Sequence, residues 1–196
     1  MGARRAVTPI DRLTIAAIVA GILSRRGIPY VIGGSVAASV IAEPRTTLDL
    51  DMMIDADTTK VRQLVKELAS DFYVDEDDAI EAVRHLRSFN AIHFQSAMKV
   101  DFFIAEPLGR EQIARREAVE ARPGGPPLYF YSAEDLVVRK LLGYRAGGES
   151  SSRQWRDVVS ILKTATLDRS SLMRRAREQQ VDDLLARAAN DAGGQL

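Results

Sequence analysis

The fold can be worked out from two segments, Tyr30-Val31-Ile32-Gly33-Gly34-Ser35 and, after thirteen intervening residues, Asp49-Leu50-Asp51. The first three residues are apolar and favour a strand, and the glycine pair after them predicts a sharp turn. Residues 35–41 are then expected to form a helix. In the second segment acidic and apolar residues alternate, which in a strand places Asp49 and Asp51 on the same face.

The glycine turn has the composition of an anion-binding loop. Gly33 and Gly34 allow the backbone to approach a ligand closely, while Ser35 stands where a helix begins, so that its hydroxyl and the free amides of the first turn point at an anion. A glycine pair alone is more often just a tight turn. Joined to the acidic pair that follows, the turn predicts a cradle for a triphosphate.

The acidic residues suit a metal site. Magnesium prefers oxygen ligands, and two metal ions need several carboxylates converging from one side of a rigid element. Asp101, inside the apolar segment 98–104, supplies a third carboxylate, which is costly to bury unless it is paired or metal-bound. Two interpretations compete with this one. Asp101 pairs with Lys99 or with an arginine, or Asp49 and Asp51 form a solvated strand face. The chain has no cysteine and two histidines, so any metal is expected to be hard and oxygen-bound.

Periodicity and capping signals predict the remaining elements. Strands are expected at 30–32, 48–54, 89–94, 98–104 and 128–131, and helices at 8–26, 35–41, 58–70, 132–144, 153–163, 169–179 and 181–190. The strands at 89–94 and 98–104 are expected to pair as a hairpin, which makes the sheet mixed or antiparallel at this end. The acidic run Asp75 to Asp78 is expected to be a solvated loop, and the threonine and proline at positions 8 and 9 the start of the first helix.

A break in regular structure is expected at Arg122-Pro123-Gly124-Gly125-Pro126-Pro127. It divides the chain into a first domain, residues 1–122, and a helical C-terminal domain, residues 128–196. The longest apolar stretch, residues 13–23, is too short to span a bilayer and lacks a cleavage site, so we expect a cytoplasmic protein without a membrane partner.

Charge is balanced overall but not locally. Lys plus Arg and Asp plus Glu both number 27, so the total favours no particular partner. Residues 71–81 contain six acidic residues and no basic one, whereas residues 139–156 are strongly basic. We expect the first region to repel phosphate and the second to attract it, including an RNA backbone.

The spacing of Gly-Gly-Ser and Asp-Leu-Asp resembles the signature of the DNA polymerase β-like nucleotidyltransferase superfamily. The superfamily pattern carries over to Gly34, Ser35, Asp49 and Asp51, with Asp101 matching the third acidic residue on a later strand. The resemblance implies an α+β fold, in which helices flank a small mixed β-sheet and a helical C-terminal part follows.

Further positions look like the AbiEii-type toxin nucleotidyltransferases within that superfamily. They are Arg45-Thr46-Thr47, the segment Glu134 to Leu141, and Arg153 with Asp157, so that the resemblance spans roughly residues 30 to 162. In that family a lysine and a later aspartate of the helical part join the active site, and Lys140 and Asp157 match them here. The C-terminal domain is therefore expected to complete the site.

Physical arguments support some of these positions and leave alternatives for others. Lys140, on a helix with an apolar face, can place a point charge on a triphosphate, and Arg45 can do so from its loop. Lys140 can equally be a surface lysine. Asp157 can orient Lys140 or the acceptor, or it can form a helix-surface salt bridge with Arg153 or Arg156.

The leading hypothesis is a magnesium-dependent nucleotidyltransferase that moves a nucleoside monophosphate from a triphosphate to an acceptor hydroxyl. Gly33, Gly34, Ser35, Arg45 and Lys140 would bind the nucleotide. The metal ligands would be Asp49, Asp51 and Asp101, and the catalytic set would add Lys140 and Asp157 to them.

Two questions stay open at this point. The resemblance implies a toxin that acts on transfer RNA and has an antitoxin partner, while a protein hydroxyl is the rival acceptor. The alternatives to an enzyme are a nucleotide-binding regulatory module without catalysis and a purely structural domain. The residues themselves select neither the acceptor nor the base of the triphosphate.

Overall fold

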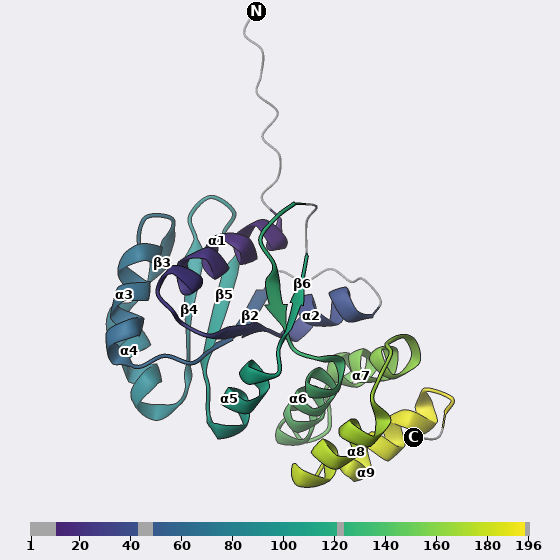
Figure 1. The fold of residues 1–196 in the computed structure, drawn as a ribbon. Helices are drawn as coiled ribbons and strands as arrows, with labels where there is room; N and C mark the ends of the chain where they lie inside the picture. The colour runs from purple at the N-terminus through teal and green to yellow at the C-terminus, as the bar shows by residue number, and fades with distance from the viewer. Residues whose placement is uncertain (1–10, 43–48, 121–123, 195–196) are drawn as a thin grey trace, which may run out of the picture.

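A computed structural model describes residues 11–42, 49–120 and 124–194 (Figure 1). Within these residues, seven strands form one mixed sheet in the order β3-β4-β5-β2-β1-β7-β6. The strands are β1 (Tyr30–Ile32), β2 (Asp49–Ile54), β3 (Phe72–Val74), β4 (Ser88–His93), β5 (Lys99–Ile104), β6 (Glu117–Val119) and β7 (Leu128–Phe130). The pairs β2–β5 and β1–β7 are parallel, and the other neighbours are antiparallel.

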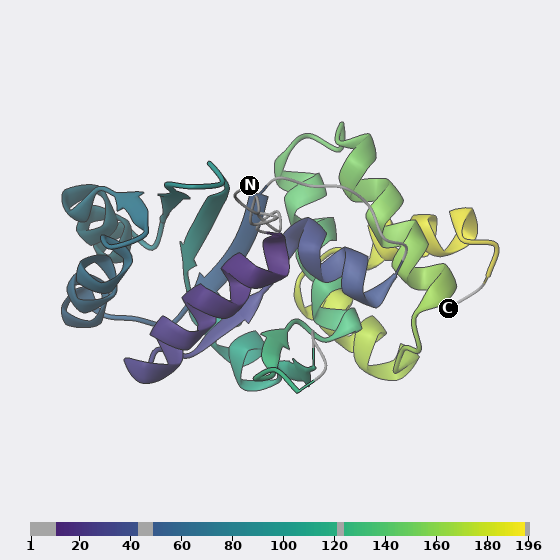
Figure 2. The ribbon, with the colours of Figure 1, turned by 90° about the horizontal axis from the view of Figure 1, so that it is seen from above.

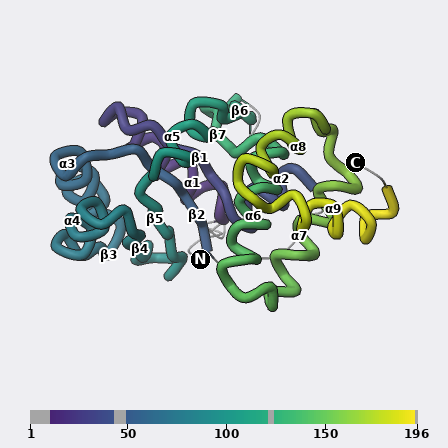
Figure 3. Tube along the Cα trace, turned by 90° about the horizontal axis from the view of Figure 1, so that it is seen from below, coloured from purple at the N-terminus to yellow at the C-terminus, as the bar shows by residue number. Residues whose placement is uncertain are grey.

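Nine helices accompany the sheet in the described part of the chain. They are α1 (Arg12–Arg25), α2 (Gly34–Ile41), α3 (Thr58–Leu68), α4 (Glu76–His85), α5 (Pro107–Ala114), α6 (Ala133–Ala146), α7 (Ser152–Thr164), α8 (Arg169–Glu178) and α9 (Asp182–Asp191). Helices α6 to α9 gather on one side of the molecule, and α3 and α4 lie at the opposite edge (Figures 2 and 3). Helix α2 contacts β2, α6 and α7, so it joins the sheet to the helical part.

The core lies under one face of the central strands. Leu50 and Met52 of β2 and Val100 and Phe102 of β5 have no exposed surface, whereas the residues that alternate with them include Asp49, Asp51 and Asp101. This alternation follows from the period of two in a strand. The α+β fold with a mixed sheet and a helical C-terminal part is therefore confirmed.

The sequence suggested a loop for the acidic run Asp75 to Asp78, but this prediction is wrong. Asp75 caps α4 by accepting a hydrogen bond of 2.9 Å from the Asp78 amide, and Glu76, Asp77 and Asp78 form the first helical turn. Carboxylates are stabilised there by the positive end of the helix dipole. The same charges that looked solvated thus also start a helix.

The first helix begins later than expected. Asp11 is its N-cap and accepts a hydrogen bond of 2.8 Å from the Thr14 amide, so that α1 starts at Arg12. The proposed cap at residues 8–10 lies outside the described residues. Among the described helices, none combines the length and the apolar character needed to cross a membrane.

The Pro/Gly stretch at 122–127 connects two strands of the same sheet. Strand β7, after it, pairs antiparallel with β6, before it, and parallel with β1. The strand expected at residues 128–131 is therefore present as β7, and the helices that follow begin with α6. The division into domains 1–122 and 128–196 stays a prediction.

Candidate active site

The glycine turn is tied to the acidic strand. The Gly33 amide donates a hydrogen bond of 2.9 Å to the backbone carbonyl of Asp51, and α2 starts at the next residue. Gly34 has φ +58°, and a Cβ there would lie 1.7 Å from Asp51 Oδ2. A Cβ at Gly33 would lie 2.8 Å from the ring of Tyr131. Both positions therefore require glycine, because the turn passes so close to these two side chains.

The carboxylates stand side by side on two parallel strands. In the register of β2 and β5, Asp51 is level with Asp101, and Asp49 is level with Lys99. Lys99 Nζ lies 2.9 Å from Asp101 Oδ2, which is the ion pair that the sequence left open. Burial raises the pKa of Asp51 above its usual range, and the negative charges of Asp101 and Asp49 raise it further.

These carboxylates have the chemistry, though not the ready-made geometry, of a metal centre. Among the described residues, no three His, Cys, Asp or Glu side chains already lie close enough to hold an ion. The mutual repulsion that raises the pKa of Asp51 is, however, what a divalent cation would relieve. Asp49 is exposed at the start of β2, and Asp101 is held by Lys99. The residues fit magnesium if Asp101 turns from Lys99 to the ion.

Lys140 and Asp157 form a buried ion pair between α6 and α7. Lys140 Nζ lies 2.7 Å from Asp157 Oδ2, and each side chain is only 8% exposed. Lys140 is therefore not a surface lysine. Asp157 fixes the position of the ammonium group, as one reading of the sequence suggested.

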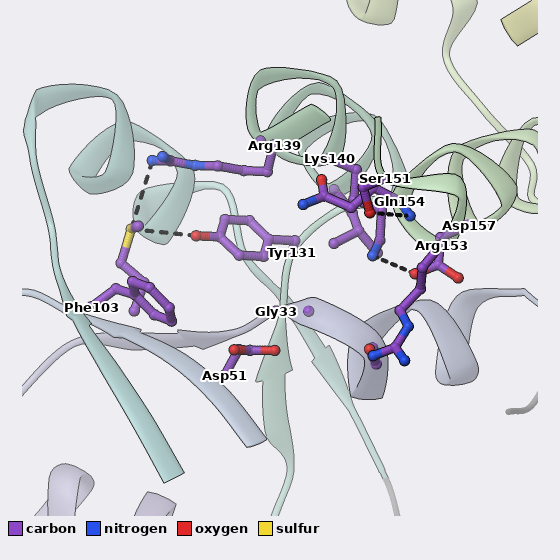
Figure 4. Close-up of a pocket in the computed structure, with 15 residues that line it drawn as sticks. Gly33, Asp51, Phe103, Tyr131, Arg139, Lys140, Ser151, Arg153, Gln154 and Asp157 are labelled. Carbon is purple, nitrogen blue, oxygen red and sulfur yellow. Dashed lines mark hydrogen bonds and ion pairs between the residues drawn. The ribbon is translucent and has the colours of Figure 1, made fainter. Parts of the chain in front are cut away.

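A cavity of about 600 Å³ separates the sheet from α6 and α7 (Figure 4). Asp51 enters it from the sheet, and Lys140 and Arg153 approach from the helices. Six of the residues predicted from the sequence line this cavity: Gly33, Gly34, Ser35, Asp51, Lys140 and Asp157. Asp49 and Asp101 lie beside Asp51 on the sheet but do not line the cavity, and Arg45 falls outside the described residues.

The structure adds Arg153 to the cavity lining. It stands in the first turn of α7, and within the described chain no ion pair or hydrogen bond engages its guanidinium group. Arg139, another cation of the lining, is held by Glu106 and Gln112 at 2.5 Å each. The basic character of residues 139–156 was visible in the sequence, but the fold decides which of these cations are already paired.

Tyr131 is a second residue that sequence reasoning missed. Its ring lies against Gly33, and its hydroxyl donates to the sulfur of Met53 at 3.3 Å. The side chain thus lines the cavity and packs against the glycine turn. Its place at the end of the strand expected at 128–131 was the available signal, because residues at a strand end often face a site.

The chain is similar to solved structures that include nucleotidyltransferases. An antigenic nucleotidyltransferase-like protein from Paracoccidioides brasiliensis matches with a TM-score of 0.54 and 20% identity, over 89% of this chain and 90% of that chain. ANT(2'')-Ia in complex with adenylyl-2''-tobramycin matches with a TM-score of 0.57 and 14% identity, over 86% of this chain and 97% of that chain. The TM-scores establish a shared fold, which is that of the DNA polymerase β-like nucleotidyltransferases, and at these low identities they establish the fold alone.

The family follows from the sequence itself. The model of the family described as "Nucleotidyl transferase AbiEii toxin, Type IV TA system" matches residues 24–191. The chain therefore belongs to the AbiEii nucleotidyltransferase toxins of type IV toxin–antitoxin systems. No curated protein matches it. The prediction that this chain is a nucleotidyltransferase is confirmed at the level of family and fold.

Proposed function

We propose that the chain is a magnesium-dependent enzyme that transfers a nucleoside monophosphate from a nucleoside triphosphate to an acceptor hydroxyl. One observation carries the proposal: the N-terminus of α2, the carboxylate of Asp51 and the cations Lys140 and Arg153 border the same cavity. At about 600 Å³ it lies within the range of ~300–1,000 Å³ typical of small-molecule sites.

The nucleotide phosphates occupy the side of the cavity formed by α2, α6 and α7. The start of α2, at Gly34 and Ser35, binds phosphate oxygens with the help of the helix dipole. Lys140 supplies a point charge in a position fixed by Asp157, and Arg153 supplies a planar fork that can bind two oxygens. Arg45 contributes a further cation on the argument from sequence.

The carboxylates would hold the metal. Asp49, Asp51 and Asp101 would be the ligands of two magnesium ions, and the ions would supply charge neutralisation at the α-phosphate and the leaving group. Gly34, whose backbone leaves room for the Asp51 carboxylate, keeps this ligand directed at the turn.

The reaction is a displacement at the α-phosphorus. The acceptor oxygen forms a bond to phosphorus, while the bond from phosphorus to the bridging oxygen breaks and its electron pair leaves with pyrophosphate. The acceptor proton passes to water. Lys140 and Arg153 balance the negative charge of the triphosphate throughout, so their contribution is positioning and electrostatic stabilisation.

The acceptor that we propose is transfer RNA, and a protein hydroxyl is the rival. In the basic region 139–156, which the sequence suggested as a contact for an RNA backbone, three of the cations already have acidic partners. Arg139 pairs with Glu106, Lys140 is buried against Asp157, and Arg145 pairs with Asp183. An antitoxin partner and a cytoplasmic location, where triphosphates and transfer RNA occur, complete the proposal.

Labelling with each radioactive triphosphate, in the presence of magnesium and either total RNA or cell lysate, tests the function. The labelled product reveals base choice and acceptor class together. Asp49→Asn with Asp51→Asn should abolish labelling, whereas Asp77→Asn with Asp78→Asn removes two exposed carboxylates from α4 and should not. Undiminished labelling by the first variant contradicts the assignment, as does triphosphate binding without pyrophosphate release under every acceptor tried.

A further inference from the structure

One face of the sheet carries exposed aromatic side chains next to the carboxylates. Residues paired directly across neighbouring strands point to the same face. Asp101 pairs with Asn90, Lys99 with Ile92, Ile92 with Tyr73, and Phe103 with Ser88. The face that bears Asp51 and Asp101 on β2 and β5 therefore continues over β4 to the edge strand β3.

This surface is unusually apolar for an exposed one. Tyr73 is 60% exposed, Phe94 61%, Phe103 39% and Ile92 38%. Phe94 follows β4 directly, and its amide donates to the carbonyl of Asp71 at 2.9 Å, so it continues the alternation on the side of Ile92. We call these four residues the aromatic face. They are the majority of the large apolar side chains left exposed in the described chain.

The nucleotide cavity leaves the aromatic face open to the acceptor. The cavity lies on the α2, α6 and α7 side of Asp51, while Asp101 stands on the next strand, outside the cavity lining. The attacking and leaving oxygens of a phosphoryl displacement lie roughly in line on opposite sides of phosphorus. With the triphosphate in the cavity, the acceptor oxygen therefore arrives from the side of β5, β4 and β3.

The chemistry of the face suits bases and not a phosphate backbone. Aromatic rings stack on the bases of single-stranded nucleic acid, and Asn90 and Ser88 between them offer hydrogen-bonding groups to base edges. Lys99 is the cation of this region, and it is engaged by Asp101. A duplex would need several cations along its backbone, which this surface does not offer among the described residues.

We propose that the aromatic face binds the unpaired 3′ end of an RNA acceptor, with its terminal bases on the aromatic rings and its terminal hydroxyl directed at Asp101. This inference rests on the proposed function, because it takes the triphosphate to occupy the cavity. Phe103 lines the cavity and belongs to the face, so it marks the junction between the nucleotide and the acceptor.

Fluorescence anisotropy with a short labelled single-stranded RNA bearing a free 3′ hydroxyl tests the proposal on the intact chain. Tyr73→Ala with Phe94→Ala should weaken RNA binding at least about tenfold, since each lost stacking contact accounts for roughly that factor. Tyr73→Phe should retain binding because the ring remains. Leu86→Ala removes an apolar side chain, 50% exposed and outside the aromatic face, and should leave binding unchanged. A blunt duplex of the same sequence should bind more weakly than the single strand.

Triphosphate affinity, measured separately by calorimetry, distinguishes the two proposals. Normal triphosphate binding by the double variant with weakened RNA binding supports the aromatic face as the acceptor site. Unchanged RNA binding by the double variant overturns the aromatic face as the acceptor site. Magnesium-dependent labelling of a protein by a wild-type chain that binds no RNA also overturns it, although the proposed transferase function would then stand. A shift in oligomeric state of the double variant, with RNA binding intact, would assign the face to a second copy. Failure of the wild-type chain to bind any triphosphate would instead contradict the proposed function.

Discussion

At the residue scale, Gly34 connects the conformation of the turn to the position of a carboxylate. Its φ of +58° costs any other residue about 1–2 kcal/mol, and a Cβ would overlap Asp51 Oδ2. Gly34→Ala should therefore displace the Asp51 carboxylate and abolish transferase activity. Gly148 is a matched control, because it has φ +67° and a Cβ added there would meet no heavy atom within 4 Å.

Gly148→Ala should lose the roughly 1–2 kcal/mol of unfolding free energy that its positive φ costs, with unchanged activity. Both quantities are measurable by urea denaturation and by the labelling assay. If the two variants lost activity equally, backbone strain and not the carboxylate contact would explain the requirement for glycine at position 34.

Arg153 allows a second comparison within one helix. Both arginines are exposed, but Arg153 lines the cavity, whereas Arg156, three residues further along α7, does not and donates a hydrogen bond to the carbonyl of Ser152. Loss of a charged hydrogen-bonding group costs about 1.5–3 kcal/mol, so Arg153→Ala should weaken triphosphate binding by at least about tenfold. Arg156→Ala should bind normally in calorimetry. Equal affinities of the two variants would remove Arg153 from the nucleotide site.

The raised pKa of Asp51 should make the free energy of unfolding depend on pH. Its folded pKa lies above the unfolded value, so the ionised form weakens the fold at neutral pH, and this penalty disappears as the pH falls below the unfolded pKa of about 4. Asp51→Asn should therefore raise the free energy of unfolding at neutral pH, by an amount that vanishes on acidification. Urea titrations between neutral and acidic pH measure this difference in unfolding free energy. Asp77→Asn on α4 is the control for the loss of one charge. A lower stability of Asp51→Asn at neutral pH would contradict the prediction.

At the scale of elements, the buried pair of Lys140 and Asp157 holds α6 against α7. Asp157→Ala leaves a buried ammonium group without its carboxylate and should cost about 3–5 kcal/mol of unfolding free energy. Lys140→Met with Asp157→Leu replaces both charges by apolar groups and should regain most of that stability, while transferase activity stays lost. Circular dichroism in urea gives the first result and the labelling assay the second. Recovery of activity in the double variant would show that the pair has only a structural role.

The elements that sequence reasoning found are those with a strong local signal. Strands β2 and β5 have clear alternation, and the C-terminal helices have apolar residues at helical spacing. Helix α4 was missed because its acidic first turn hides the apolar face formed by Ala79, Ile80 and Ala82. Strands β3 and β6 have three residues each and depend on their partners for their conformation, so their sequence carries little signal.

The site was predictable in its residue types but not in its pairing. The sequence indicated that Asp101 lies on a strand near Asp51, yet the register that sets these two side by side arises only when β2 and β5 pair in the folded chain. For the same reason the sequence could not show that Arg153 lines the cavity without an ion-pair partner among the described residues, whereas Arg139 is already bound by Glu106. Tertiary contacts decide such questions, and local patterns do not record them.

At the scale of the whole molecule, the cavity belongs to neither the sheet nor the helical part alone. The sheet provides Asp51 and the glycine turn, α6 and α7 provide Lys140 and Arg153, and α2 contacts both parts. A triphosphate bound there would connect the two parts. The contacts of α2 therefore make it one element through which a change in one part reaches the other.

The wide separation of the site residues along the chain has a consequence for synthesis of a toxin. The cavity needs groups from Gly33 through Asp157, and β2 cannot pair with β5 until the intervening helices and strands exist. A ribosome that has translated the first hundred or so residues therefore carries no assembled catalytic centre. The proposed catalytic centre is therefore complete only after translation has passed α7.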